Sequence, residues 1–221
     1  MTRSLSALLG TLLIATSTAS LQAQDSPKPA ESTPAPAPAP ESKPKPKPVV
    51  LDPATLAKLR EVAFGAAREG DSKTLDEYFK AGQPADILNN RGDSLLILAC
   101  YHGHDDAVKA ILAQSKPAIN AKNKMGFTAL TGAAFKGYIG IVKQLAAKKA
   151  DLNAANDKGQ TPLMFAAMFG RTEVVRYLVE RKVNVRAKDA QGKTARDLAK
   201  QQDNPEVEKI LLDAEKTPAK D

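Results

Sequence analysis

The sequence predicts an all-α solenoid of about five helix-turn-helix units joined by short hairpin loops. The first observation is a repeat, because Gly92, Gly126, Gly159 and Gly192 follow one another at intervals of 34, 33 and 33 residues. The second is that a short apolar segment follows each of these glycines in nearly the same register. Such a period is typical of stacked repeats, which present a binding surface more naturally than a reaction centre.

Residues 1–23 have the pattern of a secretory signal peptide. Arg3 precedes the apolar stretch LSALLGTLLIATSTA, and small and polar residues follow it up to Ala23, the expected cleavage point. The stretch is shorter than the roughly 18 to 20 apolar residues of a membrane-spanning helix. A retained anchor is the alternative to a cleaved signal, and the lack of a cysteine near Ala23 argues against a lipoprotein anchor.

Residues 24–50 are rich in Pro, Ala and Lys and predict a disordered linker. Nine of the 15 prolines of the chain lie there, and such a segment favours an extended polyproline II conformation over a packed core. We interpret it as a spacer, with a proline-rich ligand for an aromatic groove as the alternative. Its Ala-Pro and Lys-Pro tracts resemble those of Gram-negative periplasmic proteins, which implies that the exported protein is periplasmic.

The unit at about 156–188 shows most clearly why the chain repeats. Thr161 can cap a helix, and Pro162 suits the first helical position because its missing N–H costs nothing there. Gly170 then supplies a left-handed stop after the inner helix LMFAAMF. In the outer helix TEVVRYLVE, four apolar residues share one face: Val174, Val175, Leu178 and Val179.

One unit alone cannot form a stable fold. Ordering its residues costs about 50 kcal/mol, at roughly 1.5 kcal/mol per residue, and two short helices bury too little apolar surface to offset this cost. The units must therefore stack on one another.

The segment GQTPLMFAAMFGRTEVVRYLVERKVNVRAKD resembles the ankyrin repeat nearly position for position, and the unit that starts at Asn123 resembles it almost as closely. The resemblance implies a repeat domain at 51–215, followed by a disordered tail at 216–221. It divides this domain into units at about 55–88, 89–122, 123–155, 156–188 and 189–215. The family often has a histidine after its Thr-Pro-Leu opening, and this chain has other residues there, from which we expect looser hydrogen bonding between units: Ile97, Thr131, Met164 and Arg196.

The composition is that of a small exported binding protein. Of the formal net charge of +7, a share of +5 lies beyond residue 50, where acids and bases alternate without a basic stripe carrying aromatic residues. We therefore expect a protein partner, no nucleic acid, no integral membrane segment after signal cleavage, no cofactor and a monomeric protein. A single cysteine, Cys100, excludes an internal disulfide.

The sequence offers few candidates for catalysis or metal binding. Cys100 takes the place of the second alanine in the pairs Ala133-Ala134 and Ala166-Ala167, which predicts a buried and unreactive thiol. His102, His104, Asp105 and Asp106 form a cluster with metal-like composition, but the repeat pattern and the start of the outer helix already explain His104 and the two acids. We predict no enzyme, and the alternative is a metal-dependent hydrolase that uses His102 and His104.

The resemblance also implies which residues contact a partner. In ankyrin-like stacks the contacts come from the hairpin tips and from the two residues before the glycine that ends each inner helix. Read onto this chain, these positions predict a partner-binding set: Tyr101, His102, Lys124, Met125, Phe127, Phe135, Lys136, Lys158, Met168 and Phe169. Tyr101, Phe135 and Met168 recur in register as a ladder, which is either packing between inner helices or part of an exposed apolar patch with a basic rim.

The resemblance to small periplasmic ankyrin proteins implies two alternative biological roles for this chain. One is support of a stress-defence enzyme such as a haem catalase, and the other is immunity against a toxin aimed at the cell envelope. We favour the accessory role, because a dedicated toxin inhibitor more often carries a strongly charged face, whereas the charge here is mild and mixed.

Overall fold

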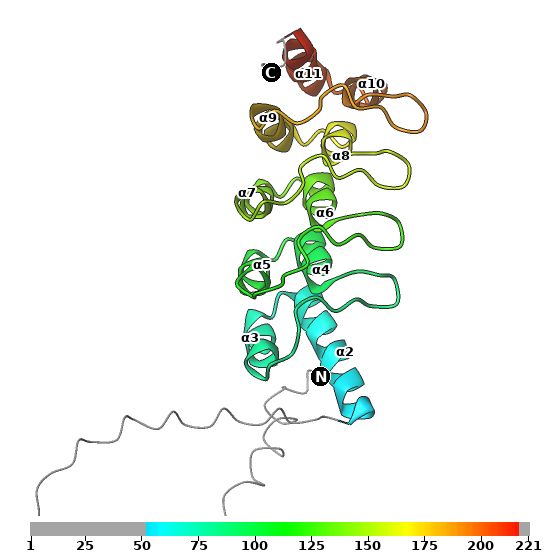
Figure 1. Ribbon diagram of the computed structural model, residues 1–221. Coiled ribbons are helices and arrows are strands. Elements are labelled where there is room, and N and C mark those ends of the chain that lie inside the picture. Colours follow the sequence, from blue (N-terminus) through cyan, green and yellow to red (C-terminus); the bar gives the residue numbers. More distant parts are fainter. Residues whose placement is uncertain (1–51, 217–221) are drawn as a thin grey trace, which may run out of the picture.

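The computed structural model describes residues 52–216, and within this range the chain forms ten helices and no β-strand (Figure 1). The predicted signal peptide at 1–23, the linker at 24–50 and residues 217–221 of the predicted tail lie outside the described residues. The helices are α2 (Pro53–Glu69), α3 (Ser72–Lys80), α4 (Leu95–His102), α5 (Asp105–Leu112), α6 (Ala129–Lys136), α7 (Ile139–Ala147), α8 (Pro162–Met168), α9 (Thr172–Glu180), α10 (Ala195–Gln201) and α11 (Pro205–Lys216). The predicted all-α solenoid is confirmed.

The helices form two parallel columns (Figure 1). The inner column holds α2, α4, α6, α8 and α10, and the outer column holds α3, α5, α7, α9 and α11. Each helix packs against its partner in the same unit and against the equivalent helix of the adjoining unit. The long loops between units project on the side of the inner column, so that loops and inner helices together form one flank of an elongated stack (Figure 1).

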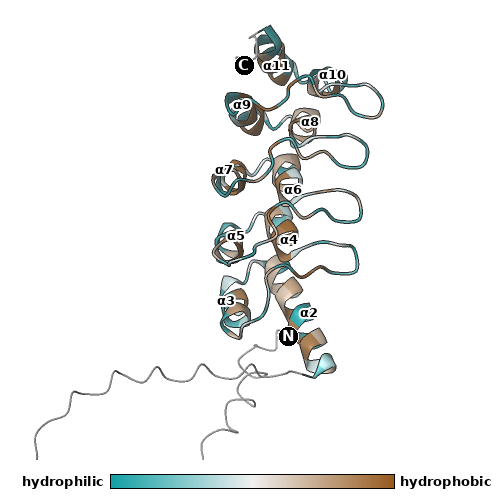
Figure 2. Ribbon diagram, in the orientation of Figure 1, coloured by the Kyte–Doolittle hydropathy of each residue, from teal (hydrophilic) through white to brown (hydrophobic). Residues whose placement is uncertain are grey.

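The core lies where the two columns meet. The alanine pairs Ala133-Ala134 and Ala166-Ala167 are fully buried, which lets neighbouring inner helices approach closely, and Leu163 is only 1% exposed. The apolar face predicted for the outer helix is also found, because Val174, Val175 and Leu178 are buried and Val179 packs against the core from a partly buried position. Figure 2 shows the strongest apolar colours on the helices and mostly neutral or hydrophilic colours on the hairpin loops.

The predicted signals for helix start and stop are present in the clearest unit. The Thr161 hydroxyl accepts a hydrogen bond from the backbone N–H of Met164 at 3.3 Å, and Pro162 is the first residue of α8. Gly170, the second residue after the end of α8, has a φ angle of +62°. The capping hydroxyl and the left-handed glycine therefore set the length of this inner helix.

In the last unit the residue after the position of the Thr-Pro-Leu opening is Asp197, which caps Thr194, and not Arg196 as expected from the sequence. Hydrogen bonds between units arise at positions other than this opening. The Nε2 atom of His104 lies 2.9 Å from the backbone oxygen of Arg68 in the unit before it. The Nε atom of Arg171 donates to the backbone oxygen of Phe135 at 3.0 Å, again across a unit boundary. At the start of α5 and of α9, a side chain thus satisfies a carbonyl at the end of the inner helix of the preceding unit, a group that has no partner within its own helix.

A side chain of the next unit packs against the glycine turn between α4 and α5. Gly103 has a φ angle of +82°, and a Cβ atom there would lie 2.7 Å from the ring of Tyr138. Gly192, in the last hairpin, has a similar φ angle of +75°, but a Cβ atom there would meet nothing within 4 Å. Gly103 is therefore required both for its backbone conformation and for the space that Tyr138 occupies.

The first inner helix is longer than the repeat predicts. Helix α2 has 17 residues, whereas α4 and α6 have 8 each. Asp52 caps α2, because its Oδ1 atom accepts from the N–H groups of Ala54 and Thr55 at 3.1 and 3.0 Å, and Pro53 takes the first helical position. This cap starts the helix before the predicted unit boundary at about 55.

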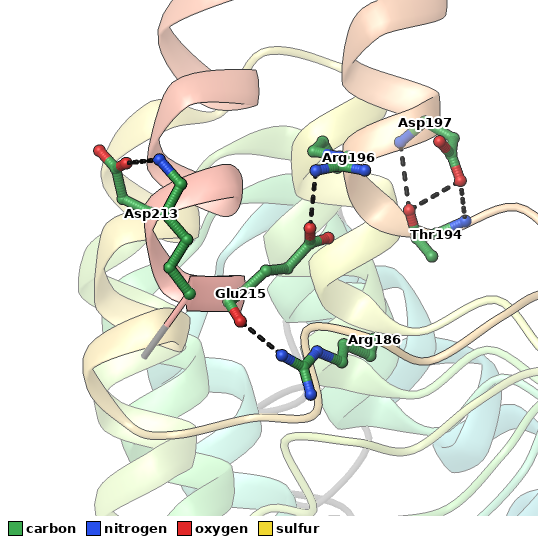
Figure 3. Close-up of polar contacts among 7 residues, drawn as sticks. Arg186, Thr194, Arg196, Asp197, Asp213 and Glu215 are labelled. Atoms are coloured by element: carbon green, nitrogen blue, oxygen red, sulfur yellow. Dashed lines mark hydrogen bonds and ion pairs between the residues drawn. The ribbon is translucent and has the colours of Figure 1, made fainter. Parts of the chain in front are cut away.

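The last unit is closed by charged residues (Figure 3). The Glu215 carboxylate pairs with Arg196 Nη1 at 2.8 Å, and the side chains are 17% and 35% exposed. Arg186 donates to the backbone oxygen of the same Glu215, so one residue near the end of α11 is held from two elements. Thr194 and Asp197 cap each other at the start of α10, with a hydroxyl to carboxylate distance of 2.8 Å. Polar contacts replace the apolar neighbour that a further unit would supply.

Candidate protein-binding groove

A groove of about 640 Å³ lies on the flank formed by the inner helices and the hairpin loops. Its floor comes from α4 and α6, with one residue each from α2 and α8, and its wall comes from the first two hairpins. The groove therefore crosses unit boundaries and exists only when the units are stacked.

An aromatic row begins with two residues of the floor and continues to a third residue that contacts the floor without lining the groove. We use this name for Tyr101, Phe135 and Phe169. The rings of Tyr101 and Phe135 are stacked, with centroids 6.1 Å apart and planes at 6°. The Phe135 and Phe169 rings meet edge to face at 4.5 Å. Tyr101 and Phe169 are 41% and 42% exposed, so the row packs together and still presents apolar surface to solvent.

The hairpin wall is also apolar. The ring of Phe127 meets the ring of Phe165 edge to face at a centroid distance of 5.4 Å, which joins the second hairpin to α8. Met125, at the tip of the same hairpin, is 61% exposed. A partner would therefore find one anchored aromatic side chain and one flexible methionine on this side of the groove.

Asn123 fixes the conformation of that hairpin. Its Oδ1 atom accepts from the N–H groups of Met125 and Phe127 at 3.0 and 2.9 Å. Its Nδ2 atom donates to Asp93 in the preceding hairpin at 2.8 Å. The two hairpins are further joined by a hydrogen bond from the Lys124 N–H to the Arg91 backbone oxygen at 3.0 Å. The wall is thus held in place before any partner binds, which lowers the entropy cost of binding.

The charged groups of the groove are mainly basic. Arg68, Arg91 and His102 line it, and the Lys136 Nζ atom lies 4.6 Å from the centroid of the Tyr101 ring. Burial, followed by the charges of His104, Arg68 and Lys136, lowers the pKa of His102, so a positive charge on this imidazole is disfavoured.

Asp93 is the one acid that lines the groove in the described part of the chain, and it is only 7% exposed. Its Oδ1 atom accepts from Asn123 and its Oδ2 atom accepts from the Asn89 amide at 3.2 Å. Its carboxylate is therefore used inside the hairpins and offers little to a partner.

The cysteine and the His-Asp cluster, the two candidates for catalysis or metal binding, have structural roles. Cys100 is fully buried, and burial raises the pKa of its thiol far above the ordinary value. His104 bonds to a backbone oxygen, while Asp105 accepts from Gln144 at 2.6 Å and Asp106 pairs with Lys109 at 3.0 Å. Between residues 52 and 216 no group of three or more His, Cys, Asp or Glu residues is placed to hold a metal ion.

The structure gathers most of the predicted contact residues at one place. Five of the ten line the groove: Tyr101, His102, Met125, Phe127 and Phe135. Lys136 and Phe169 touch this group through their ring contacts. Lys124 is exposed in the wall hairpin, and Lys158 is exposed in the next hairpin. Met168 is partly buried against the core, and Phe169 in its place contacts Phe135.

Eleven of the sixteen residues that line the groove were absent from the predicted set, among them Arg68, Arg91 and Phe165. Arg68 stands two residues before Gly70, which is the position that Tyr101 holds before Gly103. The same register applied to the first, divergent unit would have found it. No comparable signal marks Phe165, because its position inside an inner helix is typical of core residues.

The repeats match a known family. A family model described as ankyrin repeats in three copies matches residues 63–156 and 133–221. The chain belongs to the ankyrin-repeat family. An ankyrin repeat protein of Pseudomonas aeruginosa is 48% identical over 46 residues, which are 21% of this chain and 27% of that protein. The match to this curated relative thus spans about a quarter of the relative's length.

Membership of the family indicates a protein-interaction module, and ankyrin-repeat proteins are generally non-catalytic. A search of the described residues for a helix with the length and apolar character needed to cross a bilayer found none.

Proposed function

We propose that this protein is a non-catalytic adaptor that holds one protein partner in the groove. The observation that carries the proposal is the aromatic row, which exposes ring surface beside a preformed hairpin wall. Contiguous exposed apolar surface is uncommon on monomeric proteins, and aromatic and Met side chains are enriched where proteins dock.

We further propose that the adaptor works in the periplasm of a Gram-negative bacterium. The support for this location is the sequence alone, through the signal-like residues 1–23 and the Pro-rich residues 24–50. The proposed role is support of a stress-defence enzyme such as a haem catalase. The second candidate is immunity against an envelope-targeted toxin, and the mild, mixed surface charge makes it the weaker of the two.

Affinity purification tests the adaptor function. The tagged protein and its Met125→Asp variant are expressed in parallel, and the proteins that elute from the periplasmic fraction are identified. Met125 is 61% exposed, so the substitution places a charge in the groove without disturbing the core. One protein should elute with the unmodified chain and be lost with the variant, because an apolar partner surface would have to bury the new carboxylate.

Leu212→Asp is the matched control, since Leu212 is 37% exposed on α11 at the end of the stack. This control should retain the partner. A haem enzyme among the eluted proteins supports the accessory role, and a secreted toxin supports immunity. Equal recovery with the unmodified chain and Met125→Asp contradicts the groove as the binding site. Absence of the tagged protein from the periplasmic fraction contradicts the location.

A further inference from the structure

We propose that the occupant of the groove is a short, extended, acidic segment of the partner protein, in which one aromatic or large aliphatic side chain is flanked by carboxylates. This inference rests on the proposed adaptor function and adds the chemistry of the partner.

The charge around the groove favours an acidic occupant. Arg68 approaches from α2, Arg91 from the first hairpin and Lys136 from the end of α6, so that cations lie on different sides of the aromatic row. Asp93, the acid that lines the groove in residues 52–216, has both carboxylate oxygens in hydrogen bonds inside the hairpins. Its charge offsets one of the three cations, so Arg68, Arg91 and Lys136 together leave the rim with a net positive charge.

The cations also act on one another. The pKa of His102 is lowered by burial and by the charges of His104, Arg68 and Lys136, so the region around His102 disfavours a further positive charge. A carboxylate placed there would relieve this repulsion. Arg68 and Arg91 can each hold a carboxylate through two parallel N–H donors, which a lysine cannot do.

The dimensions favour a short extended segment. Successive ring centroids in the aromatic row are 6.1 and 4.5 Å apart. An extended chain rises about 3.4 Å per residue, so about three residues span the row. One apolar side chain would rest on the row, and residues on either side of it would reach the cations at the rim.

Three other occupants are less suited to this groove. The chain's own residues 24–50 carry four lysines against three acids, with Lys43, Lys45 and Lys47 nearest to the repeats, and would bring like charge to the rim. A second copy of the chain would bring a second basic groove. A single-stranded nucleic acid would stack on the rings, but such sites use a basic track along many nucleotides, and this row is about three residues long.

A random dodecapeptide library displayed on yeast and selected against the purified protein tests the inference. The enriched peptides should share an aromatic residue or leucine with Asp or Glu within three positions on either side. The variant Arg68→Gln with Arg91→Gln and Lys136→Gln should bind a selected peptide at least about tenfold more weakly than the unmodified protein.

The matched control removes three charges from outer-column positions, with Lys73→Gln, Lys80→Gln and Lys148→Gln, all exposed in the structure. It should bind the same peptide within about twofold of the unmodified protein, because charges more than a Debye length away are screened. Circular dichroism melting of both variants verifies that each remains folded.

Several results would overturn the inference. These are enrichment of neutral or basic peptides, no enrichment at all, an equal effect of the two triple variants, and displacement of the selected peptide by a synthetic peptide of residues 24–50 or by a dodecamer of deoxythymidine. Self-association of the protein that the selected peptide prevents would also overturn it.

If the cellular partner is lost with Met125→Asp but retained with the triple groove variant, the adaptor function stands and the acidic occupant fails. Retention with both variants removes both proposals.

Discussion

The rings of Tyr101 and Phe135 lie parallel, with centroids 6.1 Å apart and an angle of 6° between their planes, although they belong to consecutive units. The Lys136 Nζ atom covers the Tyr101 ring at 4.6 Å from its centroid. Tyr101 is nevertheless 41% exposed. The stack therefore joins two units at the surface and still leaves part of the Tyr101 side chain accessible to a partner.

Replacing both rings, with Tyr101→Ala and Phe135→Ala, should weaken partner binding by at least about thirtyfold, which corresponds to about 2 kcal/mol, the usual threshold of a binding hot spot. Thermal unfolding should shift only slightly, because Tyr101 is exposed and Phe135 is partly buried. Titration calorimetry and calorimetric melting measure the two effects. A collapse of the fold would show that these rings are core residues and that the binding surface lies elsewhere.

Leu163→Ala should lower the free energy of unfolding by about 2 to 5 kcal/mol, because Leu163 is 1% exposed and the substitution leaves a cavity in α8. Urea denaturation measures the change. The control is Met125→Ala, at a side chain that is 61% exposed, which should change the free energy by no more than about 0.5 kcal/mol. Similar losses in the two variants would contradict the placement of α8 in the core.

Gly103→Ala should destabilise the protein more than Gly192→Ala. Both glycines have positive φ angles, of +82° and +75°, which cost an alanine about 1 kcal/mol. Only at Gly103 would the new Cβ atom also meet the ring of Tyr138, at 2.7 Å. Adding Tyr138→Ala to Gly103→Ala should therefore recover part of the loss in a double-mutant cycle measured by urea denaturation. Additive losses would contradict the predicted contact.

Glu215→Ala should loosen the end of the stack, since it removes the partly buried pair with Arg196 at 2.8 Å. We expect a loss of about 1 kcal/mol and faster hydrogen exchange in α11 than in the central helices. Arg176→Ala is the comparison, because its pair with Glu206 has side chains that are 54% and 64% exposed and should contribute less. Equal exchange rates in α11 of the two variants would count against a closing role for Glu215.

The pH dependence of stability should carry a contribution from His102. Its pKa in the folded protein is below the ordinary value of 6.5. At a pH between these two values the unfolded chain binds more protons, so the free energy of unfolding falls as the solution is acidified through this window and is fully retained above 6.5. His102→Gln should therefore flatten the stability profile from pH 7 down to about pH 5.

Three aspartates with lowered pKa values affect the stability at more acidic pH. Hydrogen bonds from Thr55, Thr74 and Thr194 hold the pKa values of Asp52, Asp71 and Asp197 below 3.8, so their contributions are lost only in that lower range. Urea denaturation at several pH values separates the two windows. An unchanged slope between pH 7 and 5 in His102→Gln would refute the assignment.

Most of the fold could be predicted from local chemistry. Thr161, Pro162 and Gly170 act within a few residues of themselves, so their capping and stop functions are readable from the sequence and are found in the structure. The early start of α2 could not be predicted from the repeat, because it depends on Asp52 and Pro53, which lie before the first unit begins. The repeat describes only what is shared between units.

The floor of the groove was less predictable than the fold. The register placed Met168 after Tyr101 and Phe135, whereas the structure brings Phe169 against Phe135 and turns Met168 toward the core. Phe169 directly follows the last residue of α8, and its φ angle of −104° is no longer that of an α-helix. The direction of a side chain at a helix end depends on the local φ and ψ angles. A repeat spacing of 33 residues does not specify these angles.

The stack of equivalent helix pairs places different constraints on its middle and on its ends. Each pair packs mainly on the pairs beside it, so an extra module inserted between two existing units would find suitable neighbours and the chain would still fold. Between α4 and α6, however, such an insertion would part Tyr101 from Phe135 and divide the recognition surface. Duplication of a unit during evolution would therefore be tolerated between α8 and α10. It would be selected against between α4 and α6, where Tyr101 and Phe135 meet.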